Sequence, residues 1–136
     1  MPHLIVDYSP NLEPHANFKA LFKKFQEFVE KTDVFPVSGC RSRAIACDHF
    51  HVAKGDPKYA YIHVNFRVGY GRTPHQLKQA GEEIRKLLMD WLEPINGNGE
   101  GEIVCALSFE ITQIDPDLTW KYNPVRVHMA KHVYDH

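Results

Sequence analysis

The spacing of apolar residues changes along the first half of the chain, and each change predicts a different element. Residues 3–8 (HLIVDY) form a short, mostly apolar run that suits a buried strand. A stripe at steps of three and four, the period of one helix face, then comprises Phe18, Leu21, Phe22, Phe25, Phe28 and Val29. Pro36 and Gly39 interrupt this stripe, and the alternation in residues 43–51 (RAIACDHFH) predicts a second strand.

The second half of the chain repeats this order. Residues 59–68 (YAYIHVNFRV) are rich in the β-branched and aromatic types that favour strands. Thr73 and Pro74 suit the N-cap and first position of a helix. Its apolar stripe comprises Leu77, Ala80, Ile84, Leu87, Leu88 and Trp91. A loop rich in glycine and asparagine then leads to a long predicted strand in residues 102–114.

The order β-α-β, found twice, predicts an α+β domain over residues 1–136, with pseudo-repeats at about 2–57 and 58–118. Right-handed crossovers would pair the strands of each half in parallel, in one four-stranded mixed sheet with two helices on one face. The predicted strands look apolar on both sides, so we expect self-association to cover the free face. We expect the C-terminal arm, residues 119–136, to pack on a neighbouring subunit.

Composition narrows the class of protein. The chain is 43% hydrophobic and 24% charged, which is typical of a globular domain. Sixteen Lys and Arg against seventeen Asp and Glu give a net charge of -1, so we expect neither nucleic acid nor membrane as a partner. No targeting segment or membrane span is evident, and three cysteines without CxxC spacing suit a reducing compartment. We therefore expect a cytoplasmic protein.

Pro2 is the first candidate for chemistry. A proline at the start of a strand is tolerated, and that structural explanation is sufficient on its own. If the initiator methionine is removed, however, the ring nitrogen of Pro2 becomes a secondary amine. Because an α-amino group titrates at about 7.7–8.0, such an amine can exchange protons near neutral pH.

Several segments together resemble the tautomerase superfamily, and within it the 5-carboxymethyl-2-hydroxymuconate isomerases. They are MPHLIV at the start, VFPVSGCRSR, YAYIHV, GYGRT, QAGEEI and ALSFEI, and they span nearly the whole chain in the same order. The resemblance implies a tautomerase-like fold assembled as a homotrimer. It also implies a cofactor-independent isomerase that acts in aromatic-compound catabolism, such as the homoprotocatechuate pathway.

The resemblance implies roles for particular residues. Pro2 would be the catalytic acid and base, and Arg41 and Arg72 would bind a small anionic dienol substrate. Arg43 lies two positions from Arg41 and shares its face if the segment is extended, so it is a further candidate for substrate binding. Guanidinium groups suit this task because their fork binds carboxylates through two hydrogen bonds.

Other functions stay open at this point. GYGRT lacks both the GxGxxG and the Walker patterns, which argues against nucleotide binding. His49 with His51, and His128 with His132, make two separate pairs rather than a coordination shell, so we expect no metal. Cys40 beside Arg41 is a weak candidate for a reactive thiol. A general 2-oxo acid tautomerase, or a non-catalytic trimeric binding or scaffold protein, would be compatible with the same sequence.

Overall fold

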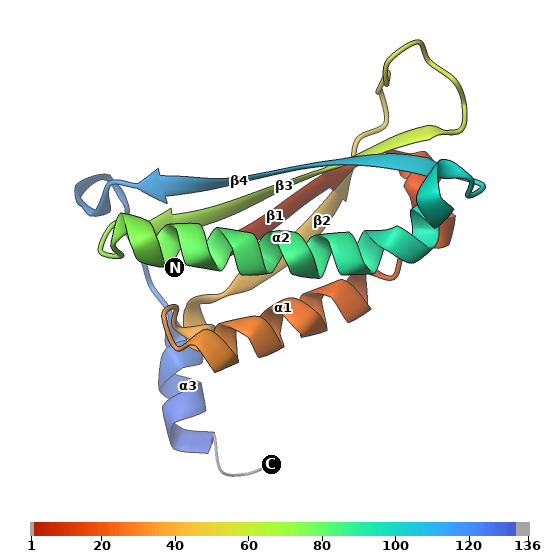
Figure 1. Cartoon of the computed structure of the whole chain (residues 1–136). Helices are drawn as coiled ribbons and strands as arrows, with labels where there is room; N and C mark the ends of the chain where they lie inside the picture. The colour runs from red at the N-terminus through yellow and green to blue at the C-terminus, as the bar shows by residue number, and fades with distance from the viewer. Residues whose placement is uncertain (1, 133–136) are drawn as a thin grey trace.

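A four-stranded mixed sheet forms one layer of the molecule, and two long helices form the other (Figure 1). The computed structural model describes residues 2–132. Its strands and helices are β1 (His3–Tyr8), α1 (Phe18–Thr32), β2 (Arg41–Ala46), β3 (Tyr59–Gly69), α2 (Pro74–Asn96), β4 (Val104–Ile114) and α3 (Pro124–His132). The predicted fold class is therefore confirmed, and the C-terminal arm contains a short helix that begins at Pro124.

The strands are ordered β2-β1-β3-β4 across the sheet. β1 runs parallel to β2, β3 runs parallel to β4, and the two pairs meet where β1 and β3 run antiparallel. Both α1 and α2 lie on the same side of the sheet (Figure 1). This is the arrangement that right-handed β-α-β crossovers impose. The division of the chain into two sequence repeats stays a prediction.

The core lies between the sheet and the two helices. Alternate residues of β1 and β3 point into it, and Val6, Val64 and Phe66 are fully buried. Phe66 packs edge-on against Phe25 of α1, with 5.3 Å between ring centroids, and against Phe35, with 4.9 Å. Such edge-to-face contacts stabilise beyond the area that they bury.

Side-chain caps fix the start of each long helix. The Asn17 side chain accepts a hydrogen bond from the Ala20 backbone at the start of α1. Thr73 and Gln76 form a reciprocal capping box at the start of α2, and Pro74 follows the cap as predicted. The strand-to-helix turn before α2 is therefore firmly set, and this matters because Arg72 lies in it.

The second strand is shorter than predicted. β2 ends at Ala46, whereas the sequence pattern extended it to residue 51. Its hydrogen-bonded neighbour β1 ends at Tyr8, whose carbonyl accepts a last bond from the Cys47 backbone. Beyond that point no neighbouring strand remains for pairing, so His49 and His51 lie in irregular backbone and do not share a strand face.

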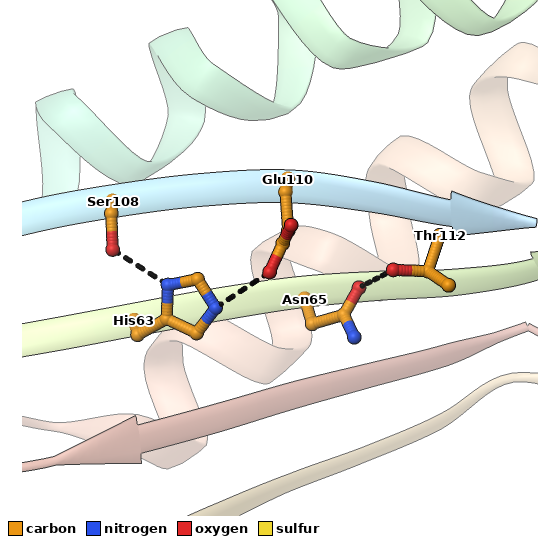
Figure 2. Close-up of polar contacts among 5 residues, drawn as sticks. All are labelled: His63, Asn65, Ser108, Glu110 and Thr112. Atoms are coloured by element: carbon orange, nitrogen blue, oxygen red, sulfur yellow. Dashed lines mark hydrogen bonds and ion pairs between the residues drawn. The ribbon is translucent and has the colours of Figure 1, made fainter.

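The free face of the sheet is far more polar than predicted. On β3 and β4 it carries two hydrogen-bonded groups, which Figure 2 shows side by side. His63 lies between Ser108 and Glu110, at 2.6 and 3.0 Å from its two ring nitrogens. Thr112 donates to the side chain of Asn65 at 3.0 Å. The prediction of strands apolar on both sides was therefore wrong, because the alternation along β3 and β4 places polar residues on one face.

Candidate active site

Three cationic or basic side chains form one row across the free face of the sheet. In the strand register His3 of β1 is the partner of Arg41 on β2 and of Arg67 on β3. Partners in a register share a face, and His3 lies on the face opposite the buried Leu4. The sheet therefore brings together three residues that are far apart in the sequence.

This row lines a hollow of about 300 Å³, which we call the cationic hollow. Its floor includes His3, Arg41 and Arg67, and the C-terminal arm supplies Trp120, Lys121 and Tyr122 along one side. No acidic side chain is among the residues that line it. The hollow is thus suited to a small anion, held by guanidinium and ammonium groups next to aromatic rings.

Pro2 directly precedes His3 at the start of β1, but it is not among the residues that line the hollow. It is buried, and its carbonyl accepts a hydrogen bond from the Arg41 backbone at 3.0 Å. Arg67 and Gly69 both line the hollow, and Arg67 is the register partner of His3. One step further along this antiparallel register, Pro2 falls beside Val68, which is fully buried on the core side of the sheet. The structure therefore makes the backbones of Pro2 and Arg41 neighbours, with Pro2 on the side of the buried residues and Arg41 on the side of the hollow.

Arg43 is linked to the site by a hydrogen bond to His3. Its side chain is exposed, and Nη1 lies 2.9 Å from His3 Nδ1. A guanidinium has donors only, so the imidazole nitrogen accepts this bond and must be unprotonated. Arg43 does not line the hollow itself, but it contributes positive charge beside it.

Arg72 is held outside the hollow by the backbone. Its guanidinium donates to the carbonyl of Val34 at 3.3 Å and to that of Gly69 at 3.5 Å. It also lies over the ring of Phe35, 4.7 Å from the centroid. Because Gly69 lines the hollow, Arg72 is one residue removed from the site and fixes its edge.

The electrostatics of the site affect the pKa of His3. Partial burial lowers the pKa of His3 from 6.5, and the nearby Arg43, Arg41 and Arg67 lower the pKa further. Both effects disfavour the charged imidazolium. Burial is the larger cause of the lowered pKa of His3, and the three arginines add to it through their positive charge at the start of β1.

Cys40 is not a nucleophile in this arrangement. Burial raises the pKa of its thiol to about 11, although Arg41 and Arg72 oppose the shift. The reactive thiolate is therefore scarce at neutral pH. Cys40 behaves as a small, half-buried residue beside the site.

Arg67 and the arm are the parts of the site that the sequence alone did not reveal. In the sequence, Arg67 is one polar position of the predicted strand 59–68, with nothing to mark it as part of a site. Only the antiparallel register of β1 and β3 places it beside His3. Trp120 and Lys121 belong to a tail without periodicity. Within residues 2–132, no group of three or more His, Cys, Asp or Glu side chains is placed to hold a metal ion. No helix of that region is long and apolar enough to span a membrane.

The fold is that of a tautomerase-like protein. A structure described as a fused 4-OT symmetric trimer shares the fold, with a TM-score of 0.58, 13% identity, and coverage of 88% of this chain and 93% of that one. A 5-carboxymethyl-2-hydroxymuconate isomerase from Deinococcus radiodurans R1 is more similar. Its TM-score is 0.83 and its identity 28%, over 93% of this chain and 92% of that chain.

Sequence comparison identifies the family. The sequence model of 5-carboxymethyl-2-hydroxymuconate isomerase matches residues 2–129. The 5-carboxymethyl-2-hydroxymuconate Delta-isomerase of Escherichia coli is 35% identical over 125 residues, which cover 92% of this chain and 96% of the relative. The chain therefore belongs to the 5-carboxymethyl-2-hydroxymuconate isomerase family.

We predict that His3 titrates below its ordinary pKa of 6.5 and that Arg43→Gln raises this pKa part of the way back, because burial remains. Below pH 6.5 the unfolded chain binds the extra proton and the folded chain does not. The free energy of unfolding should therefore fall as the pH drops from 6.5 toward the lower folded pKa. Histidine NMR titration measures both pKa values, with Arg85→Gln on the exposed face of α2 as the control. An unchanged pKa in Arg43→Gln would contradict the assignment.

Proposed function

We propose that this isomerase acts on 5-carboxymethyl-2-hydroxymuconate or a similar 2-hydroxy-dienoate in aromatic-compound catabolism. The main supporting observation is that a hollow at the start of β1 is lined by His3, Arg41 and Arg67 without any acidic side chain, and that the Arg41 backbone donates a hydrogen bond to the carbonyl of the buried Pro2. Family membership supports the reaction, because the E. coli relative is a 5-carboxymethyl-2-hydroxymuconate Delta-isomerase. The protein would do this in the cytoplasm, without a cofactor.

In the proposed reaction, the amine of Pro2 moves one proton within the substrate. The nitrogen takes the proton of the 2-hydroxyl group, and the electrons of that O–H bond form the C2=O bond. The two double bonds of the dienol become one, between C3 and C4. C5 receives the proton from the proline ammonium, so the amine is restored and the product is an unsaturated ketone. A proton-transfer group in such a position contributes about 10²–10⁴ in rate.

This role requires that Pro2 is free of Met1 and neutral when the substrate arrives. Burial and nearby guanidinium groups both lower the pKa of an amine. Pro2 is buried, and the same arginines that lower the pKa of His3 surround the start of β1. These surroundings favour the neutral amine near physiological pH.

Arg41 and Arg72 have different roles in this proposal. Arg41 lines the hollow and would bind the carboxylate beside the enol, stabilising the negative charge that collects on the 2-oxygen. Arg72 does not line the hollow; from its place beside Gly69 it would bind substrate with the donors that its three hydrogen bonds to the Val34 and Gly69 carbonyls leave free, and it would hold Gly69 in place. Arg43 would add positive charge through its contact with His3.

We also propose that the protein is a homotrimer. Both helices cover one face of the sheet and leave the other face free. Bulky side chains of the C-terminal arm are unusually exposed for a folded chain: Trp120 by 86% and Tyr122 by 80%. Apolar surface of this kind marks a contact with another protein. A neighbouring subunit that packs on the arm would cover it.

Replacing Pro2 by alanine tests the central claim. The Pro2→Ala protein should fold, since no ladder hydrogen bond depends on the ring, but it should lose about 10² or more in kcat. The loss is expected because a mobile primary amine replaces an oriented secondary one. The measurement is the rate of ketonisation of 5-carboxymethyl-2-hydroxymuconate. Wild-type turnover by the variant would remove Pro2 from the mechanism.

The control for this experiment is the mass of the intact protein from its native cell. A mass without Met1 would show that the amine of Pro2 is free, and the kinetic comparison would then test its role. A mass that includes Met1 would show that the nitrogen of Pro2 is an amide without useful basicity. Such a result would favour a non-catalytic binding protein over an isomerase that uses Pro2.

Both arginines should contribute to activity and to stability. Arg41→Gln should lower kcat/KM by about ten- to a hundredfold, the value of a charged hydrogen bond, and should lower the free energy of unfolding by about 1 kcal/mol because the Gly39 carbonyl loses its donor. Arg72→Gln should also lower the free energy of unfolding by about 1–2 kcal/mol, because it leaves the Val34 and Gly69 carbonyls without their donor. Steady-state kinetics and urea unfolding measure the two effects, with Arg85→Gln as the control. A wild-type kcat/KM in Arg41→Gln would exclude it from the site.

The trimer predicts a particular mass in solution. Light scattering on the purified protein should give three times the 15.7 kDa of the chain. Removal of residues 119–136 should shift the population toward single chains if the arm lies between subunits. A mass of one chain for the full-length protein at micromolar concentration would refute the trimer.

A further inference from the structure

His3 occupies the middle of the row that lines the cationic hollow. In the strand register it lies between Arg41 on β2 and Arg67 on β3, and its half-buried side chain forms part of the floor. Adjacent strands are about 4.8 Å apart, so His3 is within reach of any anion that both guanidinium groups bind.

The hydrogen bond to Arg43 determines which ring nitrogen of His3 carries the proton. Nη1 of Arg43 lies 2.9 Å from Nδ1 of His3, and a guanidinium only donates, so Nδ1 is the acceptor. A neutral imidazole then has its single proton on the other nitrogen, Nε2. Within residues 2–132 this Nε2 has no hydrogen-bond partner. The N–H group is therefore available to a ligand.

The neutral form of His3 suits the crowded row. An imidazolium would lie between two guanidinium groups on the neighbouring strands and would be repelled by both. Partial burial lowers the pKa of His3, and the charges of Arg43, Arg41 and Arg67 lower it further. Burial and positive charge therefore both favour the form with a single N–H donor.

The C-terminal arm contributes no group that would favour a charged His3. Its titratable side chains in the lining are Lys121, which is a cation, and Tyr122, which is a phenol. No carboxylate lines the hollow. A neutral N–H group in these surroundings offers a further hydrogen bond to an anion without adding to the repulsion between the cations.

We propose that neutral His3 donates a hydrogen bond from Nε2 to a carboxylate oxygen of the ligand in the cationic hollow, and that Arg43 is a positioning residue that holds the imidazole in this form. This inference rests on the proposed function for the presence of a substrate carboxylate in the hollow. It adds one binding residue to Arg41. Arg43 does not line the hollow and acts through His3.

Binding of sorbate tests the hydrogen bond without catalysis. Sorbate is a conjugated dienoate without a 2-hydroxyl group, so it has no hydroxyl proton to transfer. His3→Phe keeps a planar ring but lacks the N–H group, and should weaken sorbate binding about tenfold or more in calorimetry or an NMR titration. His3→Gln should keep part of the affinity, because the side-chain amide also donates.

The matched control is His15→Phe, which replaces an exposed histidine that does not line the hollow. It should bind sorbate as the wild-type protein does. Undiminished binding in His3→Phe would overturn the proposal, and so would an equal loss in His15→Phe.

Nitrogen NMR tests the protonation state of His3 in the complex. Long-range proton–nitrogen spectra distinguish a protonated ring nitrogen from an unprotonated one. At neutral pH, His3 should carry its proton on Nε2 alone, both in the free protein and with sorbate bound. Protonation of both ring nitrogens in the complex would show an ion pair instead, and would overturn the neutral donor.

A double-mutant cycle tests the positioning role of Arg43. Arg43→Met removes the donor to Nδ1 and should weaken sorbate binding. His3→Phe should then weaken binding less in the Arg43→Met protein than in the wild type, because the imidazole is no longer held in place. Additive effects of the two substitutions would show that Arg43 does not act through His3.

Kinetics separate this inference from the proposed function. If His3→Phe lost sorbate binding but kept the wild-type kcat/KM, the hollow would bind carboxylates without being the substrate site. The proposed function would then lose its site, and the role of His3 would stand. If His3→Phe bound sorbate normally while Pro2→Ala lost activity, the role of His3 would fail and that of Pro2 would stand.

Discussion

The structure depends on the pairing of β1 along both of its edges. β2 pairs with one edge in parallel and β3 with the other in antiparallel orientation. This double register sends Leu4 and Val6 into the core and leaves His3 on the free face. A shift by one residue would exchange the two sets and cost the burial of the apolar ones. The same register that stabilises the core therefore also places His3 between Arg41 and Arg67.

A series of aromatic contacts connects the core with the edge of the site. Phe66 packs on Phe25 and Phe35, and Phe35 in turn lies under the guanidinium of Arg72. A cation over an aromatic face is stabilised by about 0.5–2 kcal/mol, depending on its exposure to solvent. Arg72 then holds the carbonyl of Gly69, which lines the hollow. The turn before α2 is thus fixed from the core side as well as by its capping box.

The sequence predicts the elements well because their signals are local. Three- and four-residue spacing marks both long helices, and Thr73 with Pro74 marks the start of α2. The end of β2 at Ala46 could not be read in this way, because it is set by where β1 stops. Arg67 was missed for the same kind of reason, since its nearness to His3 exists only in the register of two strands.

The clustering of positive charge gives the proposed reaction a way to adjust the basicity of Pro2 within one cycle. If Pro2 is free of Met1, the guanidinium groups that lower the pKa of His3 would lower that of the amine as well and favour its neutral form in the empty site. A bound substrate would bring carboxylates that offset this charge, so the pKa of the amine would rise when it must hold the proton. Loss of a proton to C5 then returns the site to its first state. The repulsion between the guanidinium groups of Arg41, Arg43 and Arg67 costs free energy in the empty protein, and an anionic substrate would relieve it.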